Sequence, residues 1–130
     1  MTEAKVLLEA LADFLKEDLQ AELDGVNAYK NRIATNLLSQ LLRESRLAPE
    51  KAEVETALAN CLGDGLEKDL SVSSAQISQA LRDGSLSVDD KLIEILRYRT
   101  MLQMAIDNPR YSGYREALER WPHLANQLAS

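Results

Sequence analysis

The polar side chains that could carry chemistry gather in or beside two long predicted helices. Arg32 and Asn36 lie in a stretch whose leucines recur every three or four residues, and Arg99 has a similar setting further along the chain. A guanidinium group binds carboxylate or phosphate oxygens well, often through two parallel hydrogen bonds. The candidate residues for an anionic ligand are therefore Arg32, Asn36, Arg99, Asn108 and Arg110.

Three interpretations of this polar set are open. Arg32 and Arg99 could meet with Asn36 between them, and they would then repel unless an anion or a carboxylate intervenes. First, a carboxylate from Asp13, Glu17 or Asp18 would make a salt-bridged layer that fixes helix register. Second, a bound carboxylate or phosphate would make a ligand pocket. Third, the polar residues could form a surface that contacts another protein. The first two require Arg32 and Asn36 to face neighbouring helices, where burial without a partner costs a few kcal/mol.

Most catalytic and metal sites are excluded by counting. The chain has one histidine, His123, and one cysteine, Cys61, so neither a di-iron bundle nor a closed zinc site can form. A glycine-rich phosphate loop and a nucleophile elbow are also missing from the sequence. Cys61 stands beside Leu58 and Leu62, which indicates a buried structural thiol. We therefore expect no catalytic residue, no metal and no cofactor, and a binding protein rather than an enzyme.

Composition points to an acidic helical domain. The 130 residues carry a net charge of −6, and only six residues are aromatic. No segment clusters lysine and arginine, which disfavours nucleic-acid binding and attraction to anionic lipid. In a helix–turn–helix motif, the second helix would contact DNA, and here that helix would begin with the two acids Asp89 and Asp90. Their negative charge further disfavours DNA binding. The single cysteine and an N-terminal stretch interrupted by acids favour the cytoplasm.

Apolar periodicity and helix-end signals place the elements. Asp24-Gly25 separates two long helices and predicts an antiparallel hairpin. Ser73 with Gln76, and Ser87 with Asp90, predict helix starts, and Pro49 suits the first turn of another helix. Whether that segment continues the second helix is left open. The predicted helices cover about residues 3–23, 26–46, 49–62, 73–83 and 88–107, followed by one short helix within 111–130.

The fold class that follows is all-α, an antiparallel bundle of four to five helices with a short C-terminal helix. We expect residues 1–111 to form the bundle domain and residues 112–130 to form an amphipathic tail packed on the bundle or on a partner. The tail region carries three aromatic residues, Tyr111, Tyr114 and Trp121. Such residues either contact a partner protein or seal the end of a bundle.

Three short motifs resemble an uncharacterised family of small bacterial helical proteins. They are Asn31-Arg32-Ile33-Ala34-Thr35-Asn36-Leu37, Arg43-Glu44 and Asn108-Pro109-Arg110-Tyr111, and the resemblance covers about residues 5–111. Members of that family are often encoded beside aminoglycoside-phosphotransferase-like kinases and acyl-CoA dehydrogenase-like proteins. The resemblance implies an accessory, protein-interaction role linked to such enzymes. The alternative is a small-molecule protein that binds an anionic ligand through Arg32 and Arg99, and a homodimer is possible in either case.

Overall fold

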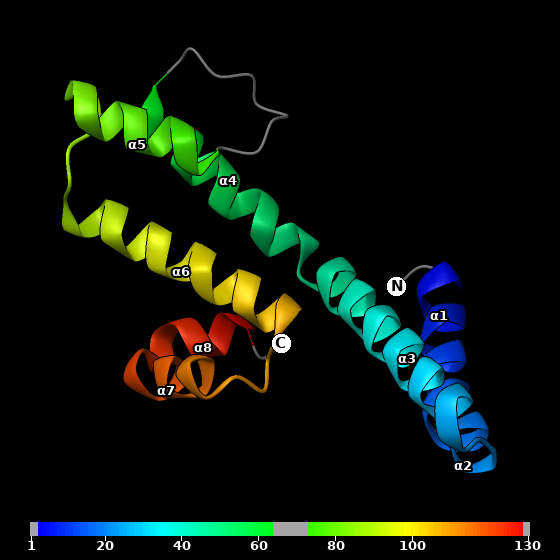
Figure 1. Ribbon diagram of the computed structural model, residues 1–130. Coiled ribbons are helices and arrows are strands. Elements are labelled where there is room, and N and C mark those ends of the chain that lie inside the picture. The colour runs from blue at the N-terminus through cyan, green and yellow to red at the C-terminus, as the bar shows by residue number, and fades with distance from the viewer. Residues whose placement is uncertain (1–2, 64–72, 129–130) are drawn as a thin grey trace. The chain divides into compact units, whose positions relative to one another are not determined.

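The computed structural model describes residues 3–63 and 73–128, and this part of the chain is helical without strands, as the sequence predicts. The chain divides into two compact units, residues 1–46 and residues 47–130. Each unit is described in turn below, with the helix labels of Figure 1.

The first unit is a helical hairpin. Its first arm runs without interruption through α1 (Glu3–Asp13), the π-helix η1 (Phe14–Leu19) and α2 (Gln20–Glu22). Gly25, with a φ of +60°, begins α3 (Gly25–Arg46), which runs back along the first arm (Figure 1). The predicted hairpin and its turn are confirmed. The π-helical stretch, which contains one residue more per turn than an α-helix, was not predicted.

The second unit contains α4 (Ala48–Leu62), α5 (Ser74–Asp83), α6 (Asp90–Asp107), α7 (Ser112–Arg120) and α8 (Pro122–Leu128). A turn at Leu47 makes α4 a helix separate from α3, with Pro49 in its first turn. Ser73 and Gln76 form the predicted capping box. The prediction of Ser87 as the next cap was wrong, because the carboxylate of Asp89 accepts the Leu92 N–H at 2.8 Å.

One hydrophobic core holds the second unit together. Helices α4 and α6 run antiparallel (Figure 1), and Leu58, Leu102 and Ile106 are almost completely buried between the helices of this unit. Tyr114 from α7 and Leu124 from α8 join the same core. The tail forms two short helices rather than the predicted one, because Pro122 excludes helical geometry at Trp121 and starts a new helix.

Candidate functional site

A buried amide joins the two arms of the hairpin. Asn31 on α3 is only 7% exposed, and its Nδ2 donates to the Leu15 carbonyl at 2.7 Å and to Gln20 Oε1 at 2.8 Å. The amide of Gln20 in turn donates to the Ala28 carbonyl at 3.2 Å. The Leu15 carbonyl also accepts the Gln20 backbone N–H in the π-helical pattern. Asn31 therefore contacts the first arm where the π-helix reaches α2.

The predicted inward direction of Arg32 and Asn36 was wrong by one residue. Both side chains are exposed, whereas Asn31 and Thr35, each one position earlier, are buried. A step of one residue turns a side chain by about 100° around the helix. Small side chains such as Ala28 line the contact and allow α3 to approach the first arm closely. Arg32 and Asn36 consequently lie beside this contact and not within it.

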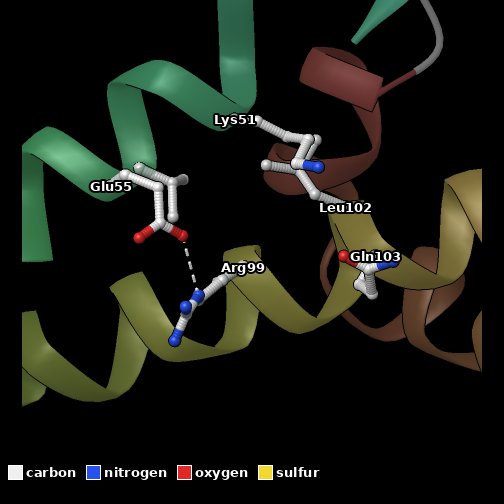
Figure 2. A pocket seen from close by; sticks show the side chains of 6 residues that line it. Lys51, Glu55, Arg99, Leu102 and Gln103 are labelled. Carbon is white, nitrogen blue, oxygen red and sulfur yellow. Dashed lines mark hydrogen bonds and ion pairs between the residues drawn. The ribbon is translucent and has the colours of Figure 1, made fainter. Parts of the chain in front are cut away.

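Arg99 forms an ion pair in the second unit. Its Nε lies 3.0 Å from Glu55 Oε1, and both side chains are about one quarter exposed. Figure 2 shows these side chains pointing toward one another from α6 and α4. They line a groove of about 150 Å³ together with Lys51, Val54, Leu102 and Gln103. The carboxylate beside Arg99 is therefore Glu55, and not one of the three acids of the first arm that the sequence suggested.

Asn108, Arg110 and Tyr111 form the connection from α6 to α7. The Asn108 N–H donates to the Met104 carbonyl at 2.8 Å, and the Asn108 carbonyl accepts the Tyr111 N–H at 3.1 Å. Asn108 follows Arg99 by nine residues, which corresponds to roughly 13 Å along a helix axis. The structure therefore does not bring Asn108 into the groove beside Arg99. The Asn-Pro-Arg-Tyr motif instead ends one helix and starts the next.

The aromatic residues of the tail have different surroundings. Tyr114 is 6% exposed and belongs to the core, so it does not offer a contact surface, whereas Tyr111 is half exposed. Trp121 is half-buried, and the guanidinium carbon of Arg97 lies 4.2 Å from its ring centroid. These contacts support the interpretation that Tyr114 and Trp121 seal the core of this unit.

A small charged cluster ties α8 to α6 beside Trp121. Glu94 contacts Arg97 at 2.9 Å and the ring Nε2 of His123 at 2.5 Å. The hydrogen bond from His123 lowers the pKa of the Glu94 carboxyl below its ordinary value, and the charge of Arg97 lowers it further. Sequence reasoning missed this cluster, because His123 is 29 residues from Glu94 and only packing brings the two together.

The buried polar contact of the hairpin did leave a signal in the sequence. Ala28, Asn31, Thr35, Leu38 and Leu42 follow one another at alternating steps of three and four, which is the spacing of a helix-packing seam. This seam was overlooked because larger apolar side chains form a second stripe on the same helix. Gln20 and Glu55, the partners of Asn31 and Arg99, carried no comparable signal.

The one cysteine and the one histidine of the chain have different surroundings. Cys61 is half-buried and packs against the core, and His123 is exposed beside Glu94. Among residues 3–63 and 73–128, no three His, Cys, Asp or Glu side chains are arranged to hold a metal ion. In the same ranges, no helix has the length and apolar character needed to cross a bilayer.

Comparison with known proteins identifies a family without an assigned activity. No curated protein and no solved structure matches the chain. The model of the domain of unknown function DUF6285 matches residues 21–111, which reach from α2 to the turn after α6 and leave α1, α7 and α8 outside. Because this match covers more than half of the sequence, the chain belongs to the DUF6285 family, a domain of unknown function.

Proposed function

We propose that this chain is a non-enzymatic helical interaction module whose contact surface lies on the hairpin of α1 and α3. The observation that carries the proposal is the apolar surface of that unit. Ten large hydrophobic side chains are exposed on the hairpin: Val6, Leu7, Leu8, Leu11, Phe14, Val26, Tyr29, Ile33, Leu37 and Leu41. Exposed apolar surface of this extent marks a site of interaction with another macromolecule.

The interior of the hairpin supports the same proposal. Its buried residues are Ala12, Ala28, Asn31 and Thr35, all small or polar. The core cluster of large apolar side chains is formed by residues 47–128 alone. Five of the ten leucines of the hairpin are exposed, and such a unit gains limited stability from its own apolar side chains, since the hydrophobic effect scales with the apolar area removed from water. Docking of a partner on these leucines would supply that burial.

The class of partner comes from the family resemblance. It implies an accessory role in bacterial cytoplasm, beside aminoglycoside-phosphotransferase-like kinases or acyl-CoA dehydrogenase-like enzymes. We propose one of these enzymes as the binding partner.

Co-elution tests this proposal. The purified chain is mixed in turn with the kinase-like and the acyl-CoA dehydrogenase-like enzyme expected to be encoded beside it. Each mixture is examined by size-exclusion chromatography with light scattering. We expect a shared peak for one enzyme, which is lost in Leu37→Glu/Leu41→Glu because two carboxylates would be buried against apolar surface. Asn36→Glu, on an exposed position of the same helix, is the matched control and keeps the shared peak. A folded chain that elutes apart from both enzymes contradicts the proposed partner class.

A second candidate function is binding of a small anionic ligand at the groove of α4 and α6. It is favoured by the presence of Lys51 and Arg99 on the groove wall, where an anion could contact both cations. Glu55 already contacts Arg99, so an anion must compete with that carboxylate. A thermal-shift screen of acyl-CoAs, nucleotides and phosphorylated sugars should raise the melting temperature of the wild type but not of Arg99→Ala. Arg32→Ala should leave that rise unchanged, because Arg32 does not line this groove.

A further inference from the structure

The hairpin has a second apolar seam beside the one that joins its arms. On α1 the seam toward α3 includes the buried Ala12 and the half-buried Glu9, and Leu8 and Leu11 each stand one residue earlier. We call the residues through which the two arms contact each other the inner seam. On α3, Leu37 and Leu41 likewise stand one residue before Leu38 and Leu42, which are half-buried residues of the inner seam. On both helices, therefore, exposed leucines lie one residue before the residues of the inner seam. There are two such leucines on each helix.

Helix geometry brings these four leucines to one side of the hairpin. A step back by one residue turns a side chain by about 100° around the axis of each helix. Because α1 and α3 run antiparallel, equal rotations away from their shared contact lead to the same side. We call Leu8, Leu11, Leu37 and Leu41 the leucine face, and their exposed fractions are 42%, 47%, 58% and 60%. Ala4 and Ala34, which are also exposed, extend the leucine face at the same helical spacing with smaller side chains.

The opposite side of the hairpin is polar. One residue after the inner seam come Asp13 on α1 and Arg32, Asn36 and Arg43 on α3. Glu9, Asp13, Lys16, Ser39 and Arg43 contribute to a groove of about 220 Å³ on this side. The hairpin is therefore amphipathic along its middle part, and on the leucine side of α3 the exposed Lys30 and Glu44 lie one turn before Ala34 and one turn after Leu41. A two-helix unit of this kind is one half of a four-helix bundle.

We propose that the leucine face binds the leucine face of a second copy of this chain, so that two hairpins form a four-helix bundle. This inference rests on the proposed function, since it takes the same exposed surface as an interaction surface and names its occupant. The leucine face and its two alanines extend from Ala4 to Leu11 on α1 and from Ala34 to Leu41 on α3, at intervals of three and four residues. None of these positions carries an ionisable side chain. Two copies can therefore meet there without like charges opposing each other, although each chain carries a net charge of −6.

The large side chains of the face supply roughly half of the area that a standard dimer interface buries. A fully exposed large apolar side chain presents about 60–120 Å² of surface that burial removes from water. The leucine face and its neighbours Leu7, Phe14 and Ile33 are about half exposed, which gives roughly 200–400 Å² of apolar surface per copy. Homodimer interfaces are about 65% apolar, so this corresponds to roughly 300–600 Å² per copy before the alanines are counted. A standard interface buries about 800 Å² per partner.

Sedimentation equilibrium and light scattering of the full chain test the inference. We expect a mass twice the 14.5 kDa of one chain, and a melting temperature that rises with protein concentration between about 1 and 100 µM. Leu11→Glu/Leu41→Glu should raise the dimer dissociation constant at least about 100-fold, because charges would be buried in an apolar interface. Asn36→Glu, on the polar side, should leave the dissociation constant unchanged.

The outcomes separate this inference from the proposed function. A wild-type chain that stays at 14.5 kDa, with a melting temperature independent of concentration, overturns the second copy as occupant even if the chain co-elutes with an enzyme. A dimer that persists in the Leu11→Glu/Leu41→Glu variant, with helical circular dichroism retained, overturns the leucine face as the interface. A dimer that dissociates in this variant, in a chain that binds neither enzyme, supports the inference and contradicts the enzyme partners. The concentration dependence of the wild type decides the question if the variant does not fold.

Discussion

Replacing Asn31 by alanine removes two of the side-chain hydrogen bonds that join the two arms of the hairpin. The amide nitrogen of Asn31 donates to the Leu15 carbonyl at 2.7 Å and to Gln20 Oε1 at 2.8 Å. The Leu15 carbonyl keeps its backbone donor, the Gln20 N–H, but Gln20 Oε1 loses the amide of Asn31. At about 0.5–1.5 kcal/mol for each bond, we expect Asn31→Ala to lower the free energy of unfolding by roughly 1–3 kcal/mol.

Asn31→Asp sharpens this prediction because it keeps the size of the side chain. The change replaces the donating nitrogen with a carboxylate oxygen that faces two acceptor oxygens at a position only 7% exposed. An acceptor opposite an acceptor repels, and a partly buried charge loses its hydration. We expect a larger loss than for alanine at neutral pH. Acid should reduce that loss, since a protonated carboxyl can donate one hydrogen bond.

Urea unfolding followed by circular dichroism measures both effects at one fixed protein concentration. Asn36→Ala is the matched control, because Asn36 is an exposed asparagine on the same helix. This control should change the free energy of unfolding by less than about 0.5 kcal/mol. If Asn31→Ala and Asn36→Ala give the same unfolding midpoint and slope, Asn31 does not hold the arms together, and the account of the hairpin given above is refuted.

Three further predictions concern the second unit. A double-mutant cycle of Glu55→Gln and Arg99→Gln should give a coupling free energy of at most about 1 kcal/mol in urea unfolding, since both groups are partly exposed. A coupling well above about 1 kcal/mol would contradict this solvent screening of the pair. The lowered pKa of Glu94 stabilises the fold above the ordinary carboxyl value of 4.5 and stops doing so as the pH falls through the lower folded value. The urea midpoint of Glu94→Gln should therefore lie below that of the wild type at pH 7, and this difference should shrink in acid; a constant difference contradicts the role of the His123 hydrogen bond. Ser73→Ala removes one half of the capping box of α5 and should cost about 1 kcal/mol, seen as faster amide hydrogen exchange in that helix, whereas unchanged exchange would contradict the cap.

Helix positions could be predicted because their end signals are local. Ser73 accepts the Gln76 N–H, and Gly84 takes the left-handed conformation that ends α5. Both depend on a few consecutive residues, so the sequence alone carries the information. Proline at position 49 acted in the same way for α4. The start of α6 was misplaced by two residues because Ser87 and Asp89 are both good caps.

The side of α3 that packs against the first arm could not be predicted from its apolar stripe. The sequence predicts an inward face from the stripe of Ile33, Leu37, Leu38, Leu41 and Leu42, but the hairpin packs through Asn31 and Thr35. Of that stripe, Leu38 and Leu42 are half-buried, and the other three side chains are exposed. Apolar periodicity shows which side avoids water, and it does not show which neighbour covers that side. The pairing of Arg99 with Glu55 spans 44 residues, and no local pattern announces a contact of that range.

The π-helical stretch Phe14–Leu19 lets the first arm hold one residue more than a regular α-helix of the same register. A π-turn contains one more residue than an α-turn, so the faces of the helix before and after it keep the relation they would have in an α-helix that is one residue shorter. If the same residues formed a regular α-helix instead, all residues before the stretch, Leu8 and Leu11 included, would rotate by about 100° and slide by about 1.5 Å relative to α3. Ala12 would then leave the inner contact, and the hydrophobic side of the first arm would no longer line up with that of the second. A relative that lacks Lys16 would present the same surface from a regular α-helix.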